Sequence, residues 1–168
     1  MKIDNFETDR FIVKKFSLKF INKNYLDWFN DCEVNKFITF NPKNLDDLKN
    51  DVLKTLKLKN AYFFAIFHKK KHIGNIKIHN IDYQQNKAWL GILIGDKNFR
   101  GIGVTPEIVK FIKISLIKKK IYFLRLNVDK KNIQAIKSYL KSGFVVEKTH
   151  NNFYTMRANI YPKKISCY

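Results

Sequence analysis

Several kinds of residue are scarce in this chain of 168 residues. Its two cysteines, Cys32 and Cys167, are too few for a disulfide framework, and no cysteine–histidine cluster has the spacing of zinc ligands, so we expect no metal. No apolar run reaches the roughly 18 residues of a membrane-spanning helix. The N-terminus lacks the apolar core of a signal peptide. These absences predict a cytoplasmic protein without a membrane partner.

Acidic residues and arginines are also few. Lysine and arginine together number 33 against 14 acidic residues, which gives a formal charge of +19, yet only four of the basic residues are arginine. Such a charge is typical of proteins that bind nucleic acid or another anion. However, the lysines are spread along the chain, and arginine is the residue best suited to bidentate phosphate and base contacts. A compositional bias explains the charge more simply, so nucleic acid is not the favoured partner.

The pattern of apolar residues predicts one α/β domain over residues 1–168. No linker or repeat interrupts the chain, and its hydrophobic content of 45% is enough for a core. Strands are predicted over 9–17, 61–68, 72–81, 87–95, 121–128, 144–150 and 152–160. Helices are predicted over 22–38, with a break between Phe29 and Val34, and over 45–59, 104–117 and 132–142. This order indicates an α/β (α+β) fold, with a mixed, mostly antiparallel sheet of about seven strands flanked by about four helices.

The stretch NFRGIGVTPEIVKFIKISLIKKK contains a candidate anion site. Gly101 and Gly103 precede Thr105, which can cap a helix, and Pro106, which suits its first turn. Glycines let an anion approach the backbone N–H groups at a helix N-terminus closely. The spacing fits neither a Walker loop nor a dinucleotide-binding motif. Taken alone, the stretch is explained equally well by a structural turn.

A second motif changes this interpretation. The chain combines RGIG with the downstream segment NIQAIKSYLKSGF, which contains Asn132, Tyr139 and Gly143. This pair of motifs resembles the GNAT superfamily of acyl-CoA-dependent N-acyltransferases. Upstream, ETDRFIVKKF and YLDWFNDCEVNKFI are similar to the branch that includes ribosomal-protein N-terminal and amino-sugar N-acetyltransferases. The resemblance covers nearly the whole chain.

The resemblance implies acetyl-CoA as the donor, held between two splayed strands. Pantetheine would pair with the strand before the glycine loop, where a main-chain N–H could also stabilise the thioester oxyanion. The diphosphate would lie on the loop, although Asn98 stands where relatives usually have Arg or Gln. The implied cofactor-binding residues are Ile92, Leu93, Ile94, Phe99, Arg100, Gly101, Ile102, Gly103, Val104 and Asn132.

Tyr139 and Asn132 have alternative interpretations. The resemblance implies that Tyr139 is catalytic and protonates the departing thiolate as a general acid. From its apolar neighbours alone, Tyr139 would be a core aromatic residue. Asn132 alone would be a helix N-cap, and this role is compatible with a contact to pantetheine.

The acceptor side of the site is less defined. Many relatives have a glutamate where this chain has Trp89, which could line the acceptor pocket or pack in the core. Trp28, Phe29 and Trp89 are the aromatic residues expected to bind the acceptor. Because an alkyl amine has a pKa near ~10, it must lose a proton before attack. The candidate bases are Asp31, Glu33, His79 and His150, and a water chain to a backbone carbonyl is a further alternative; the sequence does not choose among them.

The expected function is therefore N-acetylation of a primary amine. The basic surface favours a small anionic acceptor such as a nucleotide-linked amino sugar. Two alternatives stay open: N-terminal acetylation of a protein such as a ribosomal protein, and a non-catalytic module that binds acyl-CoA or nucleic acid on the same fold. The resemblance also makes a homodimer an expected assembly.

Overall fold

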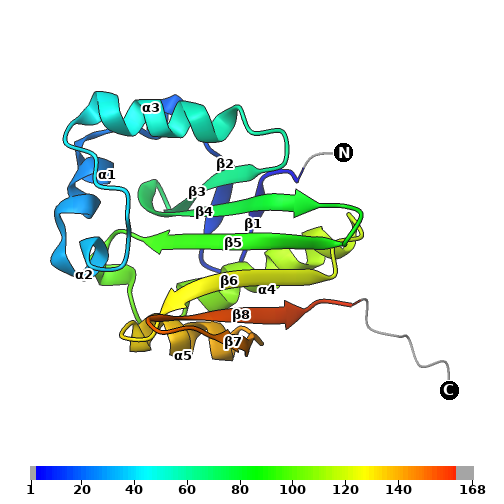
Figure 1. The fold of residues 1–168 in the computed structure, drawn as a ribbon. Coiled ribbons are helices and arrows are strands. Elements are labelled where there is room, and N and C mark those ends of the chain that lie inside the picture. The colour runs from blue at the N-terminus through cyan, green and yellow to red at the C-terminus, as the bar shows by residue number, and fades with distance from the viewer. Residues whose placement is uncertain (1–2, 162–168) are drawn as a thin grey trace, which may run out of the picture.

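The computed structural model describes residues 3–161, which form one eight-stranded sheet in the order β1-β2-β3-β4-β5-β6-β8-β7 (Figure 1). The strands are β1 (Phe6–Glu7), β2 (Ile12–Lys15), β3 (Tyr62–His68), β4 (Lys71–Asp82), β5 (Lys87–Ile94), β6 (Phe123–Asp129), β7 (Val145–Thr149) and β8 (Phe153–Asn159). The helices are α1 (Lys23–Asp27), α2 (Cys32–Asn35), α3 (Leu45–Leu56), α4 (Val104–Ile117) and α5 (Ile133–Lys141). Short 3-10 helices are η1 (Leu18–Phe20), η2 (Trp28–Asn30) and η3 (Lys97–Phe99).

The predicted mixed, mostly antiparallel sheet is confirmed, with β5–β6 as its parallel pair. One element differs from the expectation. The strand predicted over 9–17 is shorter, because the backbone N–H of Thr8 bonds to the carbonyl of Phe11 and forms the turn between β1 and β2. The break predicted within the helical segment 22–38 is confirmed: the Asp31 side chain accepts a hydrogen bond from the Glu33 N–H and caps a new helix there.

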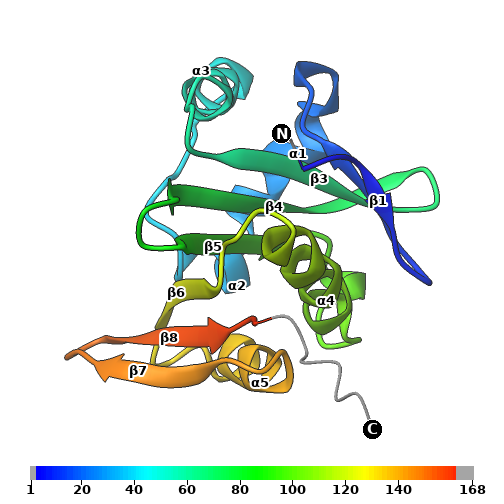
Figure 2. The same ribbon diagram turned by 90° about the vertical axis from the view of Figure 1, so that its right-hand side faces the viewer.

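Helices cover the two faces of the sheet unequally. Figure 2 shows α4 and α5 on one side and α2 and α3 on the other. Because side chains alternate along a strand, Ile76 and Leu90 pack in the core beneath α4 while Ala65 lies in a second core beneath α1 and α3. In Figure 1 no helix of residues 3–161 lies in front of β6 and β8. On that face of these two strands Asn127 and Asn159 are exposed, whereas Thr155 is buried.

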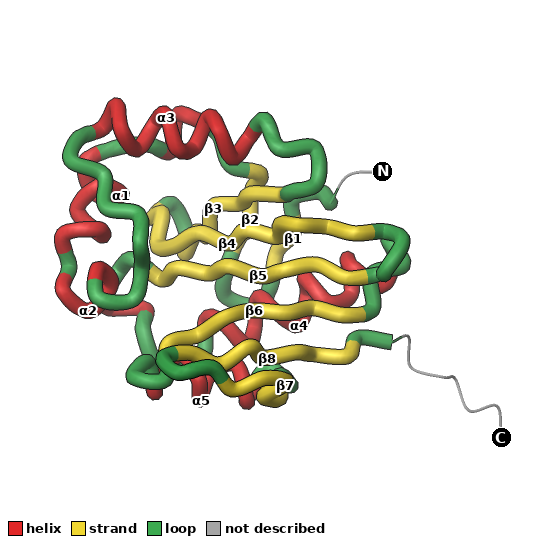
Figure 3. Tube along the Cα trace, in the orientation of Figure 1, coloured by secondary structure: helices red, strands yellow, loops and turns green. Residues whose placement is uncertain are grey.

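Strands β5 and β6 part in the middle of the sheet. They pair only from Lys87–Phe123 to Trp89–Arg125, although β5 continues to Ile94. Over this unpaired stretch β5 stays bonded to β4 on its other edge. Figure 3 shows the two strands side by side with α4 behind them. The expected splayed strand pair is thus present, and it leaves backbone groups of β5 without a strand partner on the β6 side.

Candidate active site

A cleft of about 770 Å³ occupies the gap between β5 and β6. Its walls are the two strands, the loop between β5 and α4, the side of α5 and the end of α2. The structure brings all of the predicted cofactor residues and Tyr139 to this cleft: Ile92, Leu93, Ile94, Phe99, Arg100, Gly101, Ile102, Gly103, Val104, Asn132 and Tyr139.

The glycine loop ends in a helix N-terminus. Gly101 and Gly103 both have positive φ, at 77° and 85°, a conformation that glycine adopts without strain. As predicted, the helix begins immediately after Gly103, at Val104. Its N-cap is Gly103 in the left-handed conformation, so the expectation that Thr105 caps this helix is wrong. Pro106 lies in the first turn, as predicted. The first N–H groups of a helix lack a helical acceptor and carry its positive dipole end, which suits a diphosphate.

The turn between β1 and β2 holds this loop in place. The Arg10 guanidinium donates to the Ile102 carbonyl at 3.0 Å and to Glu107 at 2.7 Å. Glu107 also accepts hydrogen bonds from the Thr8 hydroxyl at 2.6 Å and from the Arg10 N–H at 3.0 Å. Partial burial alone would raise the pKa of Glu107, but the bonds from Thr8 and Arg10 outweigh it and lower that pKa. The loop is therefore anchored from outside the cleft.

Arg100 lines the cleft, but its guanidinium binds to the protein. It donates to the carbonyl of Ile94 at 3.0 Å and lies 2.9 Å from a carboxylate oxygen of Asp31. The pKa of Asp31 is lowered, first by the backbone N–H of Glu33 and then by Arg100. Asp31 is thus an ionised and occupied carboxylate, poorly suited to act as the base. The guanidinium of Arg100 is thus already bound within the protein, and the loop's own hydrogen-bond donors are its backbone amides.

Tyr139 belongs to the core and to the cleft at once. It is 8% exposed and makes an edge-on contact with the Phe144 ring at 5.9 Å. Among residues 3–161 its hydroxyl has no hydrogen-bond partner, and burial raises its pKa to about 12. Tyr139 therefore stays protonated at neutral pH. Asn132 caps α5 by accepting the Ala135 N–H at 3.1 Å, which confirms that prediction.

The aromatic residues predicted for the acceptor lie apart from one another. Trp28 and Phe29 are 8% and 5% exposed and pack in the second core; neither lines the cleft. Trp89 is half-buried on β5, opposite Arg125, at the last paired position before the strands part. The aromatic side chain that reaches the cleft from the α2 side is Phe37, beside Ile38. Both had only an apolar spacing to mark them in the sequence.

Of the candidate bases, Glu33 alone lines the cleft. His79 lies on β4 next to Trp89, and burial, with help from Lys77, lowers its pKa. His150 stands at the β7–β8 turn, 3.2 Å from the Thr155 hydroxyl. Within residues 3–161, no group of three or more His, Cys, Asp or Glu side chains is placed to hold a metal ion; Cys167 lies outside these residues.

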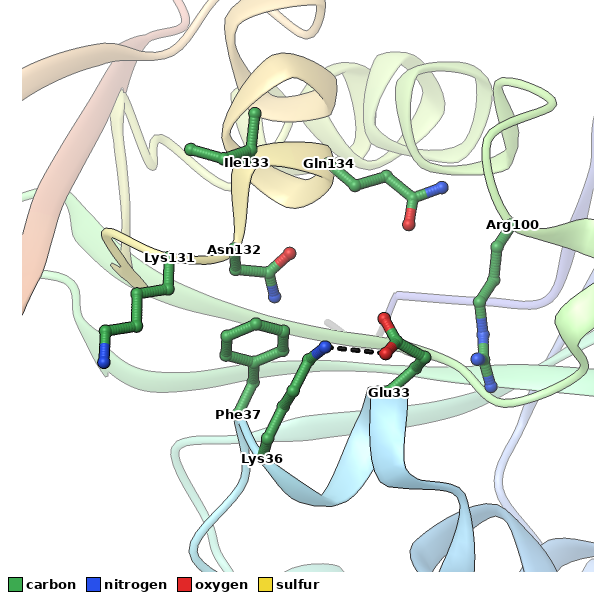
Figure 4. A pocket seen from close by; sticks show the side chains of 8 residues that line it. All are labelled: Glu33, Lys36, Phe37, Arg100, Lys131, Asn132, Ile133 and Gln134. Carbon is green, nitrogen blue, oxygen red and sulfur yellow. Dashed lines mark hydrogen bonds and ion pairs between the residues drawn. The ribbon is translucent and has the colours of Figure 1, made fainter.

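A small pocket of about 230 Å³ adjoins the cleft between α2 and the start of α5 (Figure 4). Glu33, Lys36 and Phe37 point into it from the α2 side, and Asn132 and Gln134 face them from the start of α5. Lys36 forms an ion pair with Glu33 at 2.7 Å. Lys131 and Arg100 also line the pocket, so its charge is mainly positive.

Comparison with known proteins agrees with this fold and cleft. The family model described as an acetyltransferase (GNAT) domain matches residues 10–145. The chain belongs to this family of acetyltransferases. No curated protein sequence matches it significantly.

Three solved structures illustrate the shared fold. The ribosomal L7/L12 α-N-protein acetyltransferase RimL, in complex with coenzyme A, superposes with a TM-score of 0.81 at 12% identity, over 94% of this chain and 98% of that one. The microcin C7 self-immunity acetyltransferase MccE, with acetyl-CoA and AMP, gives 0.76 at 19% identity, over 90% and 93%. The spermidine N-acetyltransferase from Vibrio cholerae, with coenzyme A and spermine, gives 0.71 at 17% identity, over 90% and 96%. No helix within residues 3–161 is long and apolar enough to cross a membrane.

Proposed function

We propose that this protein transfers an acetyl group from acetyl-CoA to the primary amine of a small anionic molecule. The observation that carries the proposal is the cleft itself. In one continuous space it joins a glycine loop at a helix N-terminus, an unpaired strand edge and the buried hydroxyl of Tyr139. Family membership and the coenzyme A or acetyl-CoA present in the three similar structures support the donor.

The residues of the cleft fit coenzyme A. The loop residues from Gly101 to Gly103 are exposed, so their backbone is open to a diphosphate. Ile92 to Ile94 line the cleft where β5 has lost its partner β6, so those of their backbone groups that neither β4 nor Arg100 binds can pair with the amides of pantetheine. On α5, Lys137 and Lys141 line the same cleft and supply positive charge for phosphate groups.

The proposed chemistry assigns each proton a destination. The amine nitrogen attacks the thioester carbon, the carbon–sulfur bond breaks, and the thiolate takes a proton from Tyr139 or is stabilised by its hydrogen bond. We assign the amine's proton to Glu33, the carboxylate of the candidate set that reaches the cleft, directly or through water. The Lys36 ammonium, 2.7 Å from Glu33, keeps that carboxylate in place.

The charge around the cleft favours an anionic acceptor. The adjoining pocket has more positive than negative side chains around it: three cations, Lys36, Lys131 and Arg100, against two carboxylates, Glu33 and the Arg100 partner Asp31. A polyamine would be repelled by this surface and by the formal charge of +19, whereas a phosphorylated or nucleotide-linked amine would be attracted. The AMP in the MccE structure shows that a protein of this fold can accommodate a nucleotide beside acetyl-CoA. A nucleotide-linked amino sugar is the acceptor that we favour.

A thiol-release assay tests the proposal. Purified protein is mixed with acetyl-CoA and one amine from each class: a nucleotide-linked amino sugar, an aminoacyl nucleotide analogue, spermidine, and a peptide with a free N-terminus. We expect the fastest release with the nucleotide-linked amines. Tight binding of coenzyme A without release for any amine would refute the enzymatic proposal and favour a non-catalytic module. Release only with the peptide would instead identify an N-terminal acetyltransferase.

A further inference from the structure

A chain of three side chains runs from the β7–β8 turn to the cleft. His150 Nε2 lies 3.2 Å from the Thr155 hydroxyl, and that hydroxyl donates to Oδ1 of Asn127 at 2.9 Å. Thr155 is 7% exposed, whereas Asn127 is exposed and lines the cleft. A threonine hydroxyl has a single proton, which here goes to Asn127, so His150 Nε2 is the donor to Thr155. The hydrogen bonds therefore all point one way, from His150 to Thr155 and from Thr155 to Asn127.

This polarity determines what Asn127 presents to a ligand. Its carboxamide oxygen is held by Thr155, and the amide nitrogen with its two protons lies on the other side of the carboxamide carbon. No residue between 3 and 161 accepts a hydrogen bond from this nitrogen. Asn127 thus offers the cleft a hydrogen-bond donor in a fixed orientation, not a carbonyl or a base.

The position of Asn127 places this donor where the strands part. Asn127 is two residues beyond Arg125, the last residue of β6 that pairs with β5, a distance of roughly 7 Å along a strand. Leu126 and Val128 point to the core beneath α4, so Asn127 lies on the opposite, accessible face. Across the gap, Gly91 has open space: a Cβ there would meet only the Cβ of Lys77, at 3.9 Å. Room for an acceptor exists beside the donor.

We propose that Asn127 selects acceptor amines that carry an oxygen atom on the carbon next to the amine-bearing carbon. A hydroxyl or carbonyl oxygen at that place accepts the hydrogen bond from Nδ2 while the nitrogen faces the thioester. Amino sugars and α-aminoacyl groups have such an oxygen; an unsubstituted polyamine does not, and its ammonium groups meet a donor. The inference rests on the proposed acetyl transfer and narrows its acceptor class. Thr155 is then a positioning residue that orients the amide.

Ethanolamine and ethylenediamine make a pair of probes of equal length, in which a hydroxyl that can accept a hydrogen bond is replaced by an ammonium that cannot. Because ethylenediamine has two amines, and the charge of one lowers the pKa of the other, kcat/KM is compared per neutral amine group. We expect kcat/KM of the wild-type protein to favour ethanolamine roughly tenfold, the value of about one hydrogen bond. Asn127→Asp replaces the donor with a carboxylate and should reverse the preference. Thr155→Val should bring the ratio towards one, with the KM for acetyl-CoA unchanged. Asn151→Asp, the same change at the exposed β7–β8 turn, should leave the ratio unaltered.

Product binding separates this inference from the proposed function. Calorimetry on the coenzyme A-loaded protein compares N-acetylethanolamine with N-acetylethylenediamine, and it needs no turnover. Tighter binding of N-acetylethanolamine, reversed by Asn127→Asp, supports the inference even if no amine is acetylated. Two results overturn the inference: a wild-type protein that prefers the diamine or its product, or an Asn127→Asp variant with the same ratio of kcat/KM or of product affinities as the wild type. Neither result contradicts the proposed acetyl transfer.

Discussion

The hydroxyl of Tyr139 can be removed with little change to the core. Tyr139→Phe keeps the ring, its edge-on contact with Phe144 and its place under the cleft, and it leaves no hydrogen-bond partner unpaired among residues 3–161. We therefore expect the free energy of unfolding to change by less than about 1 kcal/mol, as for other substitutions that preserve the shape of a core side chain. Any large kinetic effect can then be assigned to the hydroxyl.

The size of that effect follows from two pKa values. A thiol ordinarily has a pKa of about 8.5, so a tyrosine at about 12 would transfer its proton uphill by roughly 5 kcal/mol if the thiolate were solvated as in water. The burial that raises the pKa of Tyr139 also raises that of a departing thiolate, which narrows the gap. At minimum the hydroxyl donates a hydrogen bond to a charged sulfur, worth about 1.5–3 kcal/mol. We expect kcat to fall roughly 10- to 150-fold.

Steady-state kinetics at saturating acetyl-CoA, together with calorimetric binding of coenzyme A, measure this effect. Coenzyme A affinity should be unchanged, because in the proposed complex the loop, and not Tyr139, holds the diphosphate. Tyr154→Phe is the matched control: Tyr154 packs against the same core but does not line the cleft, and its variant should retain the wild-type kcat. A Tyr139→Phe variant with the wild-type kcat would refute the general-acid assignment, as would a loss of rate fully explained by weaker coenzyme A binding.

The remaining predictions concern the scaffold of the site. Gly95→Ala should lower the free energy of unfolding by about 2–4 kcal/mol, because a Cβ there would lie 1.8 Å from the Trp28 ring. The control Gly91→Ala places its Cβ in open space and should lower that free energy by less than about 1 kcal/mol. A urea titration of both variants measures the difference. Glu107→Gln should weaken coenzyme A binding several-fold by calorimetry, because it loosens Arg10 from the loop; unchanged affinity would exclude this anchoring role. The pKa of Glu107 is lowered on folding, so its contribution to the free energy of unfolding is complete above about pH 5 and is lost as the pH falls through the folded-state pKa. The wild-type protein should therefore be more stable than Glu107→Gln at neutral pH, and this difference in stability should vanish in acid.

Local patterns made much of the fold predictable. The hairpin and helix signals depend on residues that are close in the sequence. Asn132 caps α5 by accepting a hydrogen bond from the N–H of Ala135, three residues further on. Gly143, with φ of 77°, ends the same helix. These features depend on spacing within one or two adjacent elements, and spacing is what a sequence shows directly. The splayed strands were expected in a different way, from the resemblance to the GNAT superfamily that the motifs on either side of α4 carry.

Contacts between distant segments were not predictable in the same way. Trp28 looked like a ligand-binding aromatic residue, yet Gly95 leaves room for its ring in the core, and this fit depends on residues far apart in the chain. Similarly, the bond between Thr155 and Asn127 joins two strands whose register no local pattern fixes. The capping role of Thr105 was wrong for a different reason, since Gly103 also satisfies the requirements of a helix start.

The arginines of this chain support the proposal that its backbone, and not its many basic side chains, positions the anionic donor. All four are bound to carboxylates within residues 3–161, in the pairs Arg10–Glu107, Arg100–Asp31, Arg125–Glu147 and Arg157–Glu147. The uncompensated charge is therefore carried by lysines, whose ammonium groups attract anions without fixing their geometry. Such attraction is long-range and screened by salt, so it can raise the local concentration of anionic substrates but cannot orient a thioester. In the proposed complex, orientation is left to the N–H groups of the glycine loop and of β5. Arg10 holds the loop from outside the cleft, and Arg100, which lines the cleft, bonds to the Ile94 carbonyl at the end of β5.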